Sequence, residues 1–227
     1  MKKKLVVLSG AGISAESGIS TFRDQNGFWE NHDIMEVASI DGWNKNPVLV
    51  LDFYNKRRTQ LAEVEPNIAH LTLADLEREF NVHIITQNVD DLHERAQSSN
   101  IIHLHGELRK ACPENNKSKV EDIGFDKIEI GDKMNGVQKR PFIVWFGEDV
   151  PMLKQAINTV MTADILLIIG TSMNVYPADS LHDYAPNECK KYLIDPNKIA
   201  VPNSAFHQIN ETATKGILIF KDLVINH

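Results

Sequence analysis

Short apolar runs alternate with longer polar and amphipathic stretches along this chain of 227 residues. The runs at 5–8, 82–86, 101–105, 142–146, 165–169, 191–194 and 217–220 have the length of buried β-strands. Most intervals between them suit helices: Pro47 begins one, Asn67 caps a second, and residues 90–96, residues 151–161 and the region around Phe206 suit three more. Strands that alternate with helices predict an α/β fold, a doubly wound and mostly parallel sheet with helices on both faces.

Two segments interrupt this alternation and predict a smaller inserted lobe. Residues 31–69 carry helical periodicity without strands, and the helix after Asn67 has an apolar stripe of Ile68, Leu71, Leu76 and Phe80. Residues 107–139 are polar, with short alternating pieces and a turn at Asn135-Gly136. We expect a helical insertion and a small β-rich insertion.

A glycine turn follows the first strand and is the first candidate for chemistry. Gly10, Gly12 and Ala15 fit the G-x-G-x-x-G/A pattern, which lets backbone approach a pyrophosphate at a helix N-terminus. The alternative is a tight turn in which glycine serves only to reach positive φ. A dinucleotide-dependent dehydrogenase also needs an acidic residue on a second strand about 20 residues later, but Glu30 and Asp33 lie in a polar, aromatic segment. The pattern therefore favours phosphate binding over hydride transfer.

Polar residues also gather where two later strands end. Gln87, Asn88 and Asp90 follow the run 82–86, and Gly106 follows the run 101–105. Ligands of open α/β sheets bind at the carboxyl ends of the strands. His103 and His105 are two residues apart, so they share one face of a strand, and the alternation does not choose between them as a base. An imidazole with an ordinary pKa of about 6.5 can accept a proton at neutral pH.

Composition narrows the class of protein. The formal charge of −7 and a pI near 5.7 argue against an extended nucleic-acid surface. No apolar run of about 18 residues predicts a membrane span, and the short apolar run after MKKK does not suit a signal peptide, so we expect a cytoplasmic protein. The two cysteines, Cys112 and Cys189, lie far apart and predict neither a disulfide framework nor a zinc ribbon.

Five ordered motifs, GAGISAESGISTFRD, TQNVD, HLHG, VWFGE and GTS, resemble those of the sirtuin family of NAD-dependent protein lysine deacylases. The resemblance covers nearly the whole chain. It implies one catalytic domain, 1–227, with a Rossmann-like large lobe (1–27, 72–106 and 142–227) and a small lobe (28–71 and 107–141). It also implies that NAD is consumed as a co-substrate and that the partner is an acylated lysine of a protein. The sequence carries no signal for an oligomeric state.

The NAD-binding residues that the resemblance implies come from these motifs and from a few later positions. They are Gly10, Ala11, Gly12, Ser14, Glu16, Phe22, Arg23, Gln87, Asn88, Asp90, Gly170, Thr171, Ser172, Asp195, Asn197 and Thr214. The family usually has an asparagine in an N-x-E pattern where this chain has Asp195-Pro196-Asn197. Thr214 is placed by spacing alone.

The family motif selects His105 as the catalytic base, and Asn88 and Arg23 complete the implied catalytic set. In the implied mechanism, the acyl-lysine oxygen displaces nicotinamide, and His105 then deprotonates a ribose hydroxyl that attacks the resulting imidate. The products would be free lysine, nicotinamide and an O-acyl-ADP-ribose. The alternatives are an NAD glycohydrolase or mono-ADP-ribosyltransferase on the same site, and a non-catalytic NAD-binding module.

Substrate selection has its own pattern. Tyr54 and Arg57 share one face of a predicted helix, and Tyr-x-x-Arg resembles the sirtuin subgroup that removes succinyl and malonyl groups. Ala15, which is small, would leave room for a longer acyl chain. The alternative is a core tyrosine beside a solvated charge on Arg57 or Arg58. The resemblance also implies a ledge for the substrate peptide, formed by Val144, Trp145, Phe146, Gly147 and Glu148.

One departure from the family concerns the metal. Sirtuins usually hold zinc with four cysteines between the HG and FGE motifs, but residues 107–146 contain only Cys112 and no histidine. We therefore predict no zinc, with the small lobe held by apolar residues such as Ile123, Phe125 and Ile130.

Overall fold

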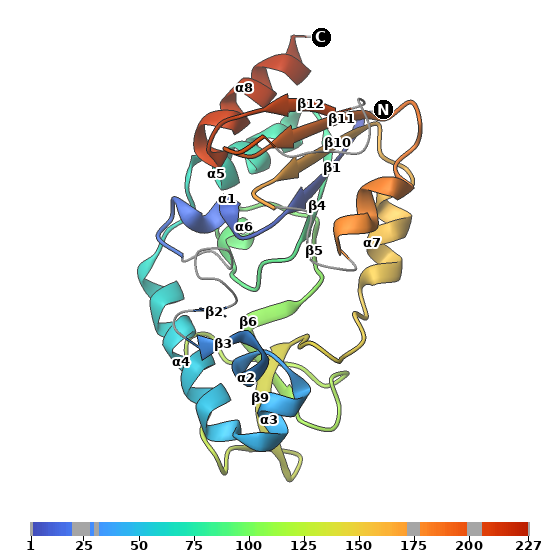
Figure 1. Ribbon diagram of the computed structural model, residues 1–227. Helices are drawn as coiled ribbons and strands as arrows, with labels where there is room; N and C mark the ends of the chain where they lie inside the picture. The colour runs from blue at the N-terminus through green and yellow to red at the C-terminus, as the bar shows by residue number, and fades with distance from the viewer. Residues whose placement is uncertain (1, 20–27, 30–31, 172–177, 199–205, 227) are drawn as a thin grey trace.

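The computed structural model describes residues 2–19, 28–29, 32–171, 178–198 and 206–226 (Figure 1). Its main sheet is parallel, with β1 (Lys4–Ser9) at the centre between β10 (Ile165–Ile169) and β4 (Asn81–Thr86). Next to β10 lie β11 (Lys190–Ile194) and then β12 (Phe206–Ile209), and β5 (Ile101–His103) lies beyond β4. The prediction of a doubly wound parallel sheet is confirmed.

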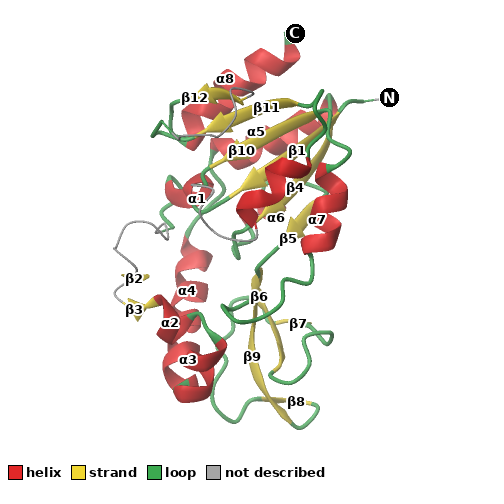
Figure 2. Ribbon diagram, turned by 45° about the vertical axis from the view of Figure 1, so that its right-hand side comes forward, coloured by secondary structure: helices red, strands yellow, loops and turns green. Residues whose placement is uncertain are grey.

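Helices cover both faces of this sheet (Figure 2). On one face, α5 (Ile68–Asp75), η1 (Leu76–Arg78) and α8 (Ala213–Ile225) pack on Leu5 and Val7. On the other face, α7 (Leu153–Val160) and η2 (Ala178–Tyr184) pack on Val6 and Leu8. Successive residues of β1 therefore enter opposite cores, which explains why the strand is apolar without a break.

The predicted elements near the C-terminus are wrong in type. Residues 217–220, predicted as a strand, belong to helix α8, and the region around Phe206, predicted as a helix, is strand β12. The buried residues Ala213, Gly216, Ile217 and Phe220 recur at helical spacing. A short apolar run fits a buried strand and a buried helix equally well, so the run 217–220 by itself did not distinguish them.

The small lobe combines helices with an antiparallel sheet. Its helices are α2 (Ile34–Val37), α3 (Ile40–Lys45) and α4 (Pro47–Glu63), beside a strand pair β2 (Phe28–Trp29) and β3 (His32–Asp33) that the sequence did not predict. Its sheet has the order β7 (Glu121–Asp122), β6 (Gly106–Pro113), β9 (Val137–Ile143) and β8 (Lys133–Met134). The predicted turn at Asn135-Gly136 is confirmed, with both residues at positive φ.

Three predictions about strands and packing in and around this lobe are wrong. Residues 142–146 are not a strand of the main sheet, because β9 ends at Ile143 and pairs with β6. Phe125 and Ile130 are exposed, and Ile128 occupies the core instead, with Ile123 partly buried against it. On α5, Ile68 and Leu71 are also exposed, whereas Ala69 and Leu73 face the main sheet. Helix α5 spans the expected lobe boundary at residue 71 and packs beside α8.

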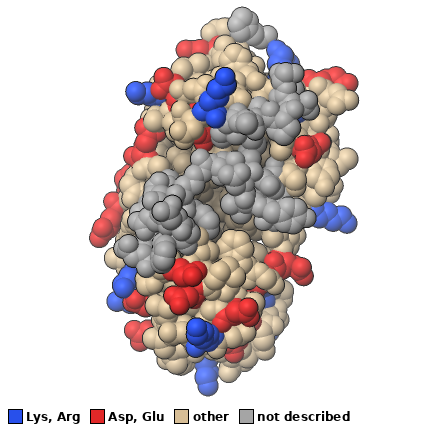
Figure 3. Space-filling view, viewed as in Figure 1, with Lys and Arg blue, Asp and Glu red and all other residues tan. Residues whose placement is uncertain are grey.

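Surface features agree with an ordinary globular chain. On the face drawn in Figure 3, the basic side chains of the described residues lie scattered among acidic ones. Within the described ranges, no helix has both the length and the apolar character needed to cross a membrane.

Candidate active site

A cleft of about 780 Å³ lies between the strand-end loops of the main sheet and the small lobe. Most of the predicted site residues line it: Gly10, Ala11, Gly12, Ser14, Ala15, Glu16, Tyr54, Arg57, Gln87, Asn88, Asp90, His105, Val144, Trp145, Phe146, Gly147, Glu148, Gly170, Thr171, Asp195 and Asn197. Phe22, Arg23 and Ser172 lie outside the described residues. Thr214 is described but binds the Glu16 carboxylate through its backbone N–H (2.9 Å) and its hydroxyl (2.7 Å).

The glycine turn after β1 is explained by close backbone contact. Neither Gly10 nor Gly12 has positive φ, so the alternative that glycine serves only to reach positive φ is wrong. A Cβ on Gly12 would lie 2.7 Å from the Cα of Gly170, and one on Gly10 would lie 2.7 Å from the Cβ of Thr171. The glycines thus allow the loop after β1 to lie directly against the loop after β10, which forms one end of the cleft.

Ser14 joins three neighbouring elements by hydrogen bonds. Its hydroxyl donates to Asp90 Oδ2 (3.0 Å) and accepts from the Asn88 amide (3.1 Å). His70, on α5, lies 3.5 Å from the same oxygen through Nε2 and accepts from the backbone N–H of Asn67 at Nδ1. That contact places the His70 proton on Nε2, and burial lowers the pKa of His70 to about 4, so it is a neutral donor to Ser14.

Asp90 is held as a buried carboxyl group. Its Oδ1 accepts from the backbone N–H of Leu92, at the start of α6 (Leu92–Arg95), and its Oδ2 accepts from Ser14. Burial raises the pKa of Asp90 more than these two hydrogen bonds lower it. Asp90 therefore presents a fixed acceptor, next to Asn88, in a weakly solvated part of the cleft.

His105 faces the cleft from the turn between β5 and β6. Its Nδ1 lies 3.1 Å from the carbonyl oxygen of Gln87. This acceptor holds the proton on Nδ1, so that Nε2 carries a lone pair, and burial lowers the pKa of His105. Gly106 must follow it, because the backbone there has φ of 84° and a Cβ would lie 2.1 Å from the carbonyl oxygen of Phe142. A neutral imidazole in this position can accept a proton.

The end of the cleft formed by the loops after β4, β10 and β11 is polar. Gln87 donates through Nε2 to the hydroxyl of Thr171 at 3.2 Å, which links the loops after β4 and β10. Asp195, at the end of β11, is buried and accepts from the backbone N–H of Asn197 through Oδ1 at 2.9 Å. The altered Asp195-Pro196-Asn197 segment thus forms a local turn.

Tyr54 and Arg57 lie on the small-lobe side of the cleft, on one face of α4. The Tyr54 hydroxyl accepts from Trp145 Nε1 at 3.0 Å, and burial raises the pKa of Tyr54 to about 12. Arg57 is 7% exposed, with its guanidinium carbon 5.8 Å from the ring centroid of Phe53. Arg58 is fully buried and donates to the carbonyls of Leu108 and Asp126. The alternative is therefore wrong about a solvated charge, for both arginines, but its core tyrosine is confirmed, because Tyr54 is fully buried in the small-lobe core.

An ion network supports the adjoining ledge, residues 144–148. Glu148 accepts from both terminal nitrogens of Arg140 (2.8 and 3.0 Å), from Lys117 Nζ (2.6 Å) and from the backbone N–H of Trp145 (2.9 Å). The Arg140 guanidinium carbon lies 3.4 Å from the Trp145 ring centroid. Among the described residues, the one group of three potential metal ligands is Glu94, His103 and Glu107, and Cys112 is not in it.

Sequence reasoning missed the apolar wall of the cleft and one of its polar supports. Ile143, Val150, Leu153 and Ile194 line the cleft beside the predicted residues. These residues carry no local signal, because ordinary apolar side chains reach a site only through tertiary packing. His70 gave no sign in the sequence that it supports Ser14, because this contact depends on the packing of α5 beside α1 (Gly12–Ala15).

The comparisons agree with this geometry. The model of the Sir2 family matches residues 10–177. A protein of Bacteroides thetaiotaomicron named NAD-dependent protein deacylase is 50% identical to this chain, over 98% of both chains. A protein of the same name from Helicobacter pylori is 55% identical to it, over 94% of this chain and 97% of the relative. A crystal structure of a Sir2 homolog–NAD complex superposes with a TM-score of 0.88 at 36% identity, covering 99% of this chain and 90% of that one. With three quarters of its length matched by one family model, and relatives this similar over nearly their full length, the chain belongs to the Sir2 family.

Proposed function

We propose that this chain is an NAD-dependent protein lysine deacylase that prefers succinyl- and malonyl-lysine. The observation that carries the proposal is the cleft, which is lined by the neutral imidazole of His105 and, on its small-lobe side, by the Tyr54–Arg57 pair. The family membership and the names of the relatives support the reaction. The acyl preference rests on the chemistry of the pair alone.

The cleft suits NAD in size and in donor set. Its 780 Å³ falls within the range of about 300–1,000 Å³ typical of ligand pockets. The glycine-lined loops after β1 and β10 would take the phosphates, with Gln87 and Asp195 toward the ribose groups. Asn88 and Asp90 would meet the nicotinamide end, where a carboxamide offers N–H groups to a carboxylate.

NAD supplies a ribose carbon whose bond to nicotinamide can break, and a neighbouring ribose hydroxyl. His105 would accept the proton of that hydroxyl at Nε2, because Nδ1 is occupied by the Gln87 carbonyl. Its lowered pKa keeps the imidazole neutral at physiological pH. Ser14, held by Asp90 and Asn88, would keep both of those side chains in place while the reaction proceeds.

The acyl end would be read by the Tyr54–Arg57 pair. The Tyr54 oxygen already accepts from Trp145, so its own hydrogen remains to be donated, and its pKa of about 12 keeps it a neutral phenol. A guanidinium can bind a carboxylate through two parallel hydrogen bonds, in a geometry that no acetyl group can match. A succinyl or malonyl carboxylate would therefore gain contacts that an acetyl group lacks.

The peptide would pair with the parts of the ledge that its own fold leaves unused. Val144 N–H donates to the His105 carbonyl, Phe146 N–H donates to the Ala38 carbonyl, and Phe146 O accepts from Ile40. Trp145 is occupied by Glu148 on both backbone groups. Within the described chain, this leaves the carbonyl of Val144 and the backbone groups of Gly147 for an extended peptide.

An acyl-panel assay with Arg57→Met tests the preference. We expect the kcat/KM for a succinyl-lysine peptide to fall by about 10- to 100-fold, the worth of hydrogen bonds between charged groups, with little change for the acetyl peptide. Lys56→Met is the matched control, because Lys56 lies on the same helix with a largely exposed side chain paired to Asp52. An equal loss on both peptides in Arg57→Met would contradict the preference for acidic acyl groups.

The same assay separates the alternative reactions. Nicotinamide release that depends on an acylated peptide supports a deacylase. Release at the same rate without peptide would support an NAD glycohydrolase or a transferase, and NAD binding without any release would support a non-catalytic module. Either of these last results would contradict the proposed reaction itself.

A further inference from the structure

Four successive backbone carbonyls, from Thr86 to Val89, accept hydrogen bonds from the segment 103–108. The two outer carbonyls bind backbone N–H groups: Thr86 O accepts from Leu104 (2.9 Å), and Val89 O accepts from Leu108 (2.7 Å). The two inner ones bind imidazoles: Gln87 O lies 3.1 Å from His105 Nδ1, and Asn88 O lies 3.1 Å from His103 Nδ1. Both histidines of the HLHG motif thus hold the loop that carries Asn88 and Asp90.

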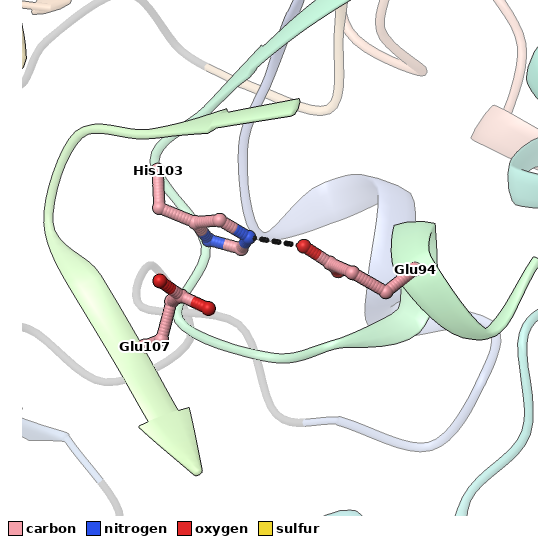
Figure 4. Close-up of side chains that lie close together, drawn as sticks. All are labelled: Glu94, His103 and Glu107. Atoms are coloured by element: carbon pink, nitrogen blue, oxygen red, sulfur yellow. Dashed lines mark hydrogen bonds and ion pairs between the residues drawn. The ribbon is translucent and has the colours of Figure 1, made fainter. Parts of the chain in front are cut away.

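His103 differs from His105 in its second nitrogen. Its Nε2 lies 2.7 Å from Glu94 Oε1 (Figure 4). Its Nδ1 lies 3.1 Å from the carbonyl oxygen of Asn88. Both partners are acceptors, and a neutral imidazole has a single N–H to donate. With Glu94 ionised, which its lowered pKa favours, only the imidazolium form of His103 satisfies both contacts, so this geometry favours a protonated ring.

Charged groups around His103 favour that form. Burial lowers its pKa, but the hydrogen bond to Glu94 and the charges of Glu94 and Glu107 outweigh burial, and the pKa lies above the ordinary 6.5. Correspondingly, the pKa of Glu94 is lowered, because the contact with His103 outweighs burial. The titratable groups that face the ring are Glu94 and His93 from α6, Asp90 from the loop, and Glu107, itself paired to Lys110 at 2.7 Å, from β6.

The same three side chains, Glu94, His103 and Glu107, have ligand atoms within 4.8 Å of one another. Two contacts argue for a shared proton rather than a bound cation. Lys110 already neutralises Glu107, and the 2.7 Å separation of His103 Nε2 from Glu94 suits a charge-assisted hydrogen bond.

We propose that His103 is a positioning residue for the NAD site, which in its doubly protonated form ties the Asn88 carbonyl to Glu94 and thereby fixes the loop 87–90. This rests on the proposed use of NAD. Loss of the proton breaks one of the two contacts, since either Asn88 O or Glu94 then faces a bare lone pair. NAD affinity is therefore expected to fall as the pH rises through the pKa of His103.

Equilibrium NAD binding, measured calorimetrically from about pH 6 to about pH 9, tests this around the ordinary histidine pKa of about 6.5. Wild type should lose affinity on the alkaline side. His103→Gln keeps a hydrogen-bond donor but does not titrate, so it should bind NAD about 10-fold more weakly at neutral pH, with no alkaline loss of its own. Its kcat at saturating NAD should change far less than its KM for NAD.

A second variant, Glu94→Gln, separates a positioning role of His103 from a merely structural one, because it should shift the pH at which His103 titrates while the His103 side chain stays in place. Glu94 is partly exposed, at the surface of α6, so the substitution should fold normally. Without the carboxylate, the His103 resonance in an NMR titration, assigned by its loss in His103→Gln, should titrate at a lower pH, and the loss of NAD affinity should move with it. His207→Gln, on the exposed edge strand β12, is the control and should match wild type.

Three results would overturn the proposal. The first is an alkaline loss of NAD affinity that is the same in wild type, His103→Gln and Glu94→Gln. The second is a His103 titration at or below pH 6.5 in wild type. The third is a divalent ion that copurifies with wild type and is lost in Glu94→Gln. Since these readouts are NAD binding, resonance position and metal content, they hold even if no acyl peptide is turned over, which is the result that would defeat the deacylase.

Discussion

The two walls of the cleft are held by different forces. On the sheet wall, Ser14, Asn88 and His105 are fixed by hydrogen bonds to backbone, hydroxyl and amide groups at the ends of strands buried on both faces. On the small-lobe wall, Trp145 is fixed by a ring contact with Arg140, whose charge is neutralised by Glu148. The first wall depends on strand register, and the second depends on charge.

The difference indicates which properties of the enzyme should resist change. Parallel strands deliver their ends to one edge of the sheet, so the sheet wall keeps its geometry as long as the sheet is folded. The small-lobe wall rests on an ion network, and a buried ion pair is strongly destabilising when one partner is removed. Substitutions on the sheet wall should therefore affect chemistry, and substitutions behind the small-lobe wall should affect stability and acyl selection.

The largest effect is expected on the sheet wall, from substitution of the proposed catalytic base His105. His105→Ala should lower kcat by about 10²- to 10⁴-fold, the usual effect of losing a general base. NAD should still bind, because the loop loses only its Gln87 contact and keeps those of Thr86, Asn88 and Val89 with the segment 103–108. Single-turnover assays and calorimetry measure the two quantities separately. His207→Ala, an exposed histidine on β12, should leave both unchanged. Unchanged turnover in His105→Ala would remove the assigned role.

The ion network of the small-lobe wall comes next. Glu148→Gln should lower the free energy of unfolding by about 3 kcal/mol, because Arg140, with a side chain only 1% exposed, loses its counter-charge. Urea denaturation measures this. The matched control is Glu121→Gln, which removes a surface pair with Lys139 in the same lobe and should cost less than about 1 kcal/mol. Equal losses of unfolding free energy in the two variants would mean that the Arg140–Glu148 network stabilises the lobe no more than a surface ion pair does.

The same network should make the stability of the small lobe depend on pH in the acid range. The hydrogen bonds from Arg140 and Lys117 outweigh burial and hold the pKa of Glu148 below its ordinary 4.5. A lowered carboxyl pKa contributes stability above the unfolded pKa, and that stability is lost as the pH falls through the folded pKa. The difference in unfolding free energy between wild type and Glu148→Gln should therefore be constant near neutrality and shrink below about pH 4.5. A difference that stays constant down to the acid transition would contradict this.

A smaller effect is expected from Tyr54→Phe, at the acyl end of the small-lobe wall. The substitution removes the hydroxyl that would donate to an acidic acyl group and leaves Trp145 Nε1 without its acceptor. We expect the kcat/KM for the succinyl peptide to fall by about 10-fold, a smaller loss than in Arg57→Met because the lost hydrogen bond comes from a neutral donor. Activity on the acetyl peptide should stay within about 3-fold, the worth of a weak hydrogen bond. Tyr192→Phe on β11 is the control, and a matching loss on the acetyl peptide would indicate a general packing role for Tyr54 instead.

The sequence predicted the sheet wall better than the support of the small-lobe wall. The strands β1 and β10 were evident from unbroken apolar runs, and β4 from a short run rich in β-branched residues. The polar residues after them fell on the sheet wall, because parallel strands bring their ends together. The type of α8 was missed, since its apolar run is short enough to be read either way. Arg140 was missed for another reason: a charged residue in a polar segment gives no sign of burial until β9, the ledge and the loop around Lys117 pack around it.

Removal of metal ions is expected to have no effect. Cys112 is fully buried beside the Arg140 network, and burial raises the pKa of its thiol, whereas a zinc site needs thiolates. Dialysis against a chelator should therefore leave the unfolding midpoint and the deacylase rate unchanged, because the contacts of Glu148 with Arg140 and Lys117 already join β9, the ledge and the loop after β6. The same chelator should not alter Glu148→Gln further. Elemental analysis that finds one zinc per chain, or a chelator that destabilises wild type as much as Glu148→Gln does, would show that a metal and not the ion network holds this wall.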